Sequence, residues 1–116
     1  MINYYFLVTA PPPGISGVSI VRDSGPVPML REPYNLTCLT NDSVSSLVWL
    51  SPSGEELKTD DQFTVGEIVR EGGLTSRTLS FNSFDQSDLG EYTCQSDTSK
   101  ASIVFEIQGI IIAYEK

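Results

Sequence analysis

The chain has 116 residues, 15 of them acidic and 7 basic, which gives a net charge of −8. This length suits one domain with a modest core of its own, and the acidic balance argues against nucleic-acid binding, because the phosphate backbone requires clustered Lys and Arg. The sequence contains no His, which removes the commonest general base and the commonest metal ligand.

The pattern of apolar residues predicts an all-β chain. Short alternating runs recur between Gly, Pro, Asn, Asp and Ser residues, and no long segment has clean helical periodicity. Turns are predicted at 51–54 and 71–73, and no apolar run reaches the roughly 18 residues of a membrane span. Strands at this spacing indicate a sandwich or a barrel. The predicted strands are Val18–Val21, Tyr34–Thr40, Leu47–Leu50, Phe63–Arg70, Leu74–Phe81, Glu91–Gln95 and Ser102–Gln108.

The two ends of the chain lie outside the domain that we place at residues 15–109. Residues 1–14 end in Pro-Pro-Pro-Gly. They are either a remnant of a secretory signal, although they lack a positive n-region, or the last strand of a preceding module followed by a stiff linker. Residues 110–116 form a C-terminal extension. Its apolar run either begins a following module or pairs with residues 4–8 as an extra strand, and the sequence leaves these alternatives open.

The chain has two cysteines, Cys38 and Cys94, which are 56 positions apart. Without His they cannot form a zinc site, which leaves free buried thiols or one long-range disulfide. Asn35 and Asn41 each begin an Asn-x-Ser/Thr sequon and are candidate N-glycosylation sites. The sequons and the cysteine pair together favour an oxidising compartment, and therefore the disulfide.

Strand alternation places both cysteines in the interior. Cys38 lies on the inward face of one strand, and Tyr92 shares the inward face of another strand with Cys94. Trp49 follows Cys38 by 11 positions, a spacing that lets a disulfide join two sheets with an indole packed against it. A Tyr two residues before the second Cys can turn its hydroxyl back to the backbone, and we expect Tyr92 to donate a hydrogen bond within the segment 85–88.

These residues resemble the immunoglobulin superfamily. The segment Thr78–Cys94, which ends in Asp-x-Gly-x-Tyr-x-Cys, matches the E–F signature of the family, and the resemblance covers residues 17–109. It implies a Greek-key β-sandwich of two antiparallel sheets. It also implies that Leu79 and Phe81 point inward from strand E and that Phe84 plugs the E–F turn. The short Cys-to-Cys distance is similar to that of an I-set-like or short variable-like module.

One position departs from the family pattern. Family members often carry an Arg at the start of strand D, where it pairs with the Asp of Asp-x-Gly, which is Asp88 here. Gln62 stands at that place, and the candidate substitutes, Arg70 and Arg77, are not at the matching position. The resemblance therefore assigns no cation to Asp88.

The sequence offers little catalytic chemistry, and we expect no enzyme activity, no cofactor and no metal. A Ser-His-Asp set is impossible without His. The acidic pairs Glu55-Glu56 and Asp60-Asp61 lack the spacing of a calcium loop and are interpreted as solvated loops. Gly72-Gly73 is interpreted as a turn, because the pattern of a phosphate loop does not follow it.

The outward face of strands C, F and G is the candidate binding surface. These strands share one sheet in the family. We expect the apolar residues of this face to form a centre with the polar ones around it, while a glycan on Asn35 would shield the opposite sheet. The outward residues predicted by alternation are Val48 and Leu50 on strand C, Thr93 and Gln95 on strand F, and Val104 and Glu106 on strand G.

The resemblance implies an extracellular or cell-surface module of a larger receptor, used in recognition or cell adhesion. Its partner would be another cell-surface protein, a second copy of the chain included, and not a nucleic acid, and we expect no membrane-spanning segment in this chain. The alternative is a structural spacer in a multi-domain extracellular chain, with no ligand of its own. The fold alone does not choose between them.

Overall fold

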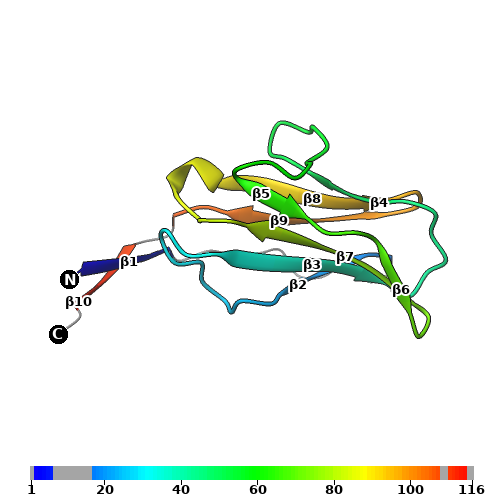
Figure 1. The fold of residues 1–116 in the computed structure, drawn as a ribbon, viewed down its shortest axis with the longest axis horizontal. Helices are drawn as coiled ribbons and strands as arrows, with labels where there is room; N and C mark the ends of the chain where they lie inside the picture. The colour runs from blue at the N-terminus through cyan, green and yellow to red at the C-terminus, as the bar shows by residue number, and fades with distance from the viewer. Residues whose placement is uncertain (1, 7–16, 108–109, 115–116) are drawn as a thin grey trace.

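The chain folds as two antiparallel sheets packed face to face, in a computed structural model that describes residues 2–6, 17–107 and 110–114 (Figure 1). The predicted all-β sandwich is confirmed, and its strand orders are compatible with the A-B-E-D and C-F-G orders of an immunoglobulin-like domain. The first sheet runs in the order β2 (Ser19–Arg22), β3 (Tyr34–Thr40), β7 (Leu74–Phe81) and β5 (Phe63–Val65), with β6 (Val69–Glu71) also paired to β7. The second sheet runs in the order β4 (Leu47–Leu50), β8 (Gly90–Ser96) and β9 (Lys100–Phe105).

An aromatic cluster fills the space between the sheets. Phe81 of β7 lies at its centre, with ring centroids 5.0 Å from Tyr92 and 5.6 Å from Phe105. Phe84, from the turn after β7, packs 5.3 Å from Phe105. Such edge-to-face pairs contribute about 0.5–1.5 kcal/mol each beyond the burial of their area. The predicted inward positions Leu79 and Phe81 are both completely buried.

Most strands lie where the sequence predicts them. β3, β4 and β7 have the predicted bounds, and β2 and β8 differ by one residue at one or both ends. β9 begins two residues earlier than predicted and ends at Phe105 rather than at residue 108. A strand that continued to residue 108 with Val104 and Glu106 outward would turn Ile107 inward, and this expectation is wrong, because Ile107 follows the strand and is 39% exposed.

The predicted strand at 63–70 is interrupted by a bulge. β5 pairs with β7 through Val65 opposite Leu79, whereas β6 pairs with it through Val69 opposite Ser76. Three residues, 66–68, therefore face the two residues 77 and 78, which is the arrangement of a β-bulge. Because a shift of one residue moves side chains to the other face, Val69 points outward and is 46% exposed.

The hairpin between β6 and β7 closes on two glycines. Gly72 has φ 57° and Gly73 has φ 80°. Two consecutive positive φ angles are required by the tight turn whose twist matches that of the flanking strands. The predicted turn at 71–73 is present, and it ends the sandwich far from β1 and β10 (Figure 1).

A separate two-stranded ribbon pairs the beginning of the chain with its end. β1 (Ile2–Phe6) runs antiparallel to β10 (Ile110–Tyr114), with Ile2 opposite Tyr114 and Phe6 opposite Ile110. Of the alternatives for residues 110–116, the structure shows the pairing, with residues 2–6 rather than 4–8; residues 7 and 8 lie outside the described residues. Figure 1 shows this ribbon projecting from one end of the sandwich. The assignment of 1–14 and 110–116 to neighbouring modules stays a prediction.

Candidate functional site

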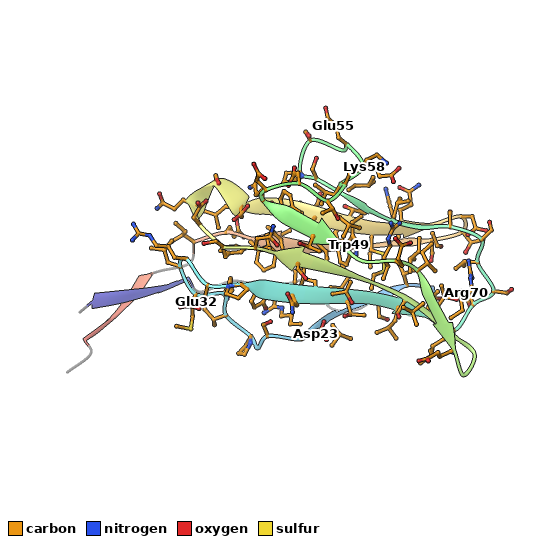
Figure 2. The ribbon with its side chains drawn as sticks, viewed as in Figure 1. Asp23, Glu32, Trp49, Glu55, Lys58 and Arg70 are labelled. Carbon is orange, nitrogen blue, oxygen red and sulfur yellow. A yellow bond between two sulfur atoms is a disulfide. The ribbon has the colours of Figure 1, made fainter. Side chains whose placement is uncertain are left out.

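The disulfide joins the two sheets beneath Trp49. Cys38 of β3 and Cys94 of β8 are bonded, with their Cα atoms 6.2 Å apart. Trp49 is completely buried and lies directly opposite Cys94 in the pairing of β4 with β8 (Figure 2). Its indole N–H donates to the carbonyl oxygen of Arg77 at 3.1 Å. Both thiols are consumed in this bond, so the cysteines stabilise the fold and supply no nucleophile.

Arg77 is a structural residue that sequence reasoning missed. Its guanidinium donates to the carbonyl oxygens of Gly66, at 2.7 Å, and Leu47, at 2.9 Å. These bonds tie the bulge of the first sheet to the start of β4 in the second. Arg70 is committed elsewhere, because its guanidinium donates to the carbonyl oxygen of Val44 at 2.7 Å. Neither Arg takes the place of the family's strand D cation.

Asp88 is a buried carboxylate held by neutral donors. It ends the short 3-10 turn η1 (Gln86–Asp88) and is 1% exposed. The Gln62 side-chain amide donates to one of its oxygens, and the backbone N–H of Asp85 donates to the other at 3.0 Å. Burial raises the pKa of Asp88, and these hydrogen bonds offset only part of that effect. Gln62 therefore occupies the family's Arg position and supplies a hydrogen bond without a charge.

The expected hydrogen bond of Tyr92 to the segment 85–88 is not present. Among the described residues the Tyr92 hydroxyl has no hydrogen-bond partner, and no fully buried side-chain oxygen or nitrogen in this part of the chain lacks one. The Tyr92 oxygen therefore keeps access to water. Burial, and to a smaller degree the charge of Asp88, raises the pKa of Tyr92. Tyr34, in contrast, does bind the backbone, because its hydroxyl donates a hydrogen bond to the carbonyl oxygen of Gly25 at 2.5 Å.

The outward face of β4, β8 and β9 carries the predicted binding residues. All six are at least partly accessible: Val48, Leu50, Thr93 and Val104 are half-buried, and Gln95 and Glu106 are exposed. Glu106 lies beyond the end of β9 rather than on it. These positions follow from the inward placement of Trp49 and Cys94, as alternation requires.

The arrangement on this face differs from the expected apolar centre. Leu50 is opposite Thr93 and Val48 is opposite Gln95, so both apolar residues lie on the edge strand β4. Val104 lies on the other edge strand, which is about 10 Å away across β8 because adjacent strands are about 4.8 Å apart. It is also displaced along the sheet, because it is opposite Glu91 rather than Thr93 or Gln95. The middle of the face is polar instead. Its centre is a hydrogen bond of 2.9 Å between the hydroxyls of Thr93 and Ser102.

The most exposed large apolar residues lie on the other sheet. Val21 is 44% exposed, and Val69 and Leu74 are each 46% exposed. Sequence reasoning missed all three as surface residues. The phase of β7 contained the signal for Leu74, since Leu79 and Phe81 point inward and an odd number of positions separates each from Leu74. Val69 had no such signal, because its orientation depends on the bulge.

The two sequons occupy different surroundings. Asn35 is half-buried, is the second residue of β3 and lies opposite Ser80. Asn41 is exposed and follows the last residue of β3. It lines a groove of about 430 Å³ together with the hairpin residues 70–75. Glycosylation at either residue stays a prediction.

The acidic pairs of the sequence support loops and turns. The carboxylate of Asp60 accepts the backbone N–H groups of Gln62 and Phe63, at 2.8 and 2.9 Å, at the start of β5. Glu55 and Lys58 project from the loop after β4 (Figure 2). Within the described residues, no group of three or more potential ligands could hold a metal ion. No helix in the same residues is long and apolar enough to cross a membrane.

No family model matches the chain, and no curated protein is similar to it. The described residues form an all-β sandwich with two antiparallel sheets and a buried disulfide. This architecture is compatible with an immunoglobulin-like domain.

Proposed function

We propose that the chain is an immunoglobulin-like recognition module of an extracellular or cell-surface protein, and that it binds another protein through the outward face of β4, β8 and β9. The observation that carries the proposal is this face itself. It presents half-buried apolar residues on both edges of a hydrogen-bonding centre, and neither sequon lies on it. Protein interfaces are of similar mixed polarity and contain about one hydrogen bond per 100–200 Å².

The extracellular assignment is supported by the disulfide. A buried disulfide that joins two sheets persists in oxidising compartments and is rare in the cytosol. The strand orders A-B-E-D and C-F-G, with Trp49 opposite the second cysteine, support the immunoglobulin-like assignment. A strongly acidic surface also suits solubility outside the cell.

A second copy of the chain is the partner that the charges favour. Lys100 is opposite Gln95 at one end of the face, and Glu91 is opposite Val104 at the other end. A second copy laid over the face with its strands reversed brings each Lys100 over the Glu91 of the other copy, which is the self-complementarity of a two-fold contact. The net charge of −8 opposes this association, so we expect a weak contact that gains from arrays on two surfaces.

The position of the β1–β10 ribbon favours the recognition module over the spacer alternative. A module that lengthens a chain should receive it at one end and release it at the other. β1 and β10 are instead paired side by side and project from the same end of the sandwich (Figure 1). This arrangement suits a module that is held on a two-stranded stem, with its long faces free.

The experiment is bead clustering by the full chain, in which self-association is detected at high surface density. Leu50→Asp should abolish clustering, whereas Val21→Asp makes the same kind of change at a 44% exposed position of the other sheet and should leave it unchanged. Lys100→Glu should abolish clustering, and adding Glu91→Lys should restore it, because the charge pair is then reversed. If clustering survives Leu50→Asp in a folded chain, the outward face of β4, β8 and β9 is not the binding surface, and the spacer becomes the better assignment. If the unaltered chain does not cluster, the partner is not a second copy.

A further inference from the structure

Leu74 and Val69 form an exposed apolar surface beside the Asn41 sequon. Each is 46% exposed on the outward face of the first sheet. With Leu39 and Ser76 they line a groove of about 240 Å³. Leu74 and Glu71 also line the groove of about 430 Å³ that reaches Asn41, so the same two side chains border both hollows.

The strand register places Asn41 next to Leu74. The last pair of the β3–β7 ladder is Thr40 opposite Thr75, so the next pair in this register is Asn41 and Leu74. Thr40 and Thr75 are both buried, and Asn41 and Leu74 are both exposed. Asn41 leaves the ladder at this point, and it lines the same groove as Leu74.

We propose that Asn41 carries an N-linked glycan whose first sugars lie in the groove of about 430 Å³ beside it and extend over Leu74 and Val69. The inference uses only the extracellular location from the proposed function. In the modification, the Asn41 amide nitrogen forms a bond to C1 of the first sugar of a lipid-linked oligosaccharide diphosphate. The bond from C1 to the diphosphate oxygen breaks, the lipid diphosphate leaves, and the amide nitrogen loses one proton.

The groove offers the two kinds of contact that an N-acetylglucosamine ring requires. Its C–H groups can pack on Leu74 and Val69, which removes apolar surface from water. Its hydroxyl and acetamido groups can reach the polar side chains of Ser43, Arg70 and Glu71, which line the groove of about 430 Å³ at Asn41. A volume of 430 Å³ is within the range of about 300–1,000 Å³ that is typical of small-ligand sites. Because the sugar is covalently held beside the groove, its contacts need not overcome the cost of association.

Asn35 provides an internal control on the same sheet. Its cross-strand neighbour is Ser80, which in turn is opposite Thr64. The next outward residue of β3, Thr37, is hydrogen-bonded to the hydroxyl of Thr78 at 3.0 Å. On the β2 side the exposed apolar residue is Val21, which is opposite Thr37 and 44% exposed, and Leu74→Ser leaves it unchanged. The effect of a glycan on Asn35 should therefore not depend on Leu74.

The test is to secrete the full chain from eukaryotic cells as Asn35→Gln, which leaves the Asn41 sequon, and as Asn41→Gln, which leaves the other. Intact mass gives occupancy, and each glycoform is trimmed enzymatically to one sugar. We expect the trimmed Asn41 glycan to raise the melting temperature by about 2–4 °C over the unglycosylated chain from bacteria with the same substitution. Leu74→Ser, at an exposed position, should remove most of this increase. The Asn35 glycan should give a shift that is unaffected by Leu74→Ser.

Three results would overturn the inference. They are an Asn41 sequon that stays unoccupied while Asn35 is occupied, an Asn41 glycan without a stabilising effect, and a stabilising effect that persists in Leu74→Ser. Slower amide exchange at Gly72 and Gly73 in the Asn41 glycoform, lost in Leu74→Ser, would support it. Bead clustering through the opposite face does not depend on these outcomes, so the two proposals can fail separately.

Discussion

Replacing Gln62 by Arg should stabilise the chain near neutral pH, and the gain should disappear in acid. Asp88 is 1% exposed and receives hydrogen bonds only from the Gln62 amide and the Asp85 backbone N–H among the described residues. Burial raises the pKa of Asp88, so its charged form is destabilised by folding. An Arg at position 62 would place a cation on a carboxylate that now has only neutral donors.

The magnitude is set by the exposure of position 62. An adjacent opposite charge lowers the pKa of a carboxyl group by about 1–3 units. Because Gln62 is exposed, water screens the new pair and the lower end of this range applies. One unit corresponds to about 1.4 kcal/mol of unfolding free energy, which is a rise of about 5 °C in melting temperature for a domain of this size.

The sign with pH follows from proton binding. In the unaltered chain the folded-state pKa of Asp88 is above its unfolded value, so the folded state binds more protons between the two values and the contribution of Asp88 improves as pH falls through the raised pKa. In Gln62→Arg the folded-state pKa of Asp88 is lower than in the unaltered chain. The added stability is therefore fully present above the raised pKa of the unaltered chain and is lost as the pH falls through the two folded-state values. The difference between the two chains should be largest at neutral pH and nearly absent at about pH 2.

The assay is urea unfolding of Gln62→Arg and of Gln95→Arg, a control with the same change in net charge. Gln95 is exposed and lies on β8 of the other sheet. Asp88→Asn, made alone and in the Gln62→Arg background, completes a double-mutant cycle in which the gain from Gln62→Arg should be absent without Asp88. If Gln62→Arg is no more stable than Gln95→Arg, or if its advantage persists in acid, then Asp88 does not use a cation at this corner and the reasoning is wrong.

Three further changes test other features of the core. Tyr34→Phe should lower the unfolding free energy by about 0.5–1.5 kcal/mol because it removes the bond to Gly25, and Tyr92→Phe should cost less; equal losses in urea unfolding would contradict the assignment. Gly90→Ala should cost about 1–3 kcal/mol more than Gly54→Ala, because both have positive φ but only at Gly90 would the new Cβ lie 2.6 Å from Pro52; similar midpoints would refute this. Removing both cysteines by Cys38→Ala and Cys94→Ala should cost about 4 kcal/mol for a loop of this length, and two titratable thiols in the unfolded, unreduced chain would show that the bond is absent.

The interior of the sandwich could be predicted because its signals are local. Alternation in β3, β4 and β7 fixes which residues point inward, and these strands have the predicted bounds. Cys38, Trp49 and Cys94 then meet because each lies on an inward face. A two-residue period needs only a few positions to be recognised, and one buried face specifies the register strongly.

The surface could be predicted less well because it depends on register between strands. The polar centre of the β4–β8–β9 face follows from the position of β8 between two edge strands, and this order comes from the resemblance and not from alternation. Val69 depends on a one-residue bulge that the sequence 63–70 does not mark, apart from Gly66. The free hydroxyl of Tyr92 shows the same limit, since a motif places the ring but not the atoms that its oxygen reaches.

The outward faces of the two sheets differ in polarity, and we therefore propose different kinds of ligand for them. The first sheet exposes apolar surface at Val69 and Leu74, and a sugar held on Asn41 can cover it permanently, because covalent attachment removes the cost of association. The second sheet exposes hydroxyls and amides, with Lys100 on β9 at one end of the face and Glu91 on β8 at the other. Such a face loses little by staying in water between encounters, and its charges select the orientation of a partner. Under the two proposals, the exposed apolar residues of the first sheet lie beside a covalently attached glycan. The polar face of the second sheet is left for a partner that binds reversibly.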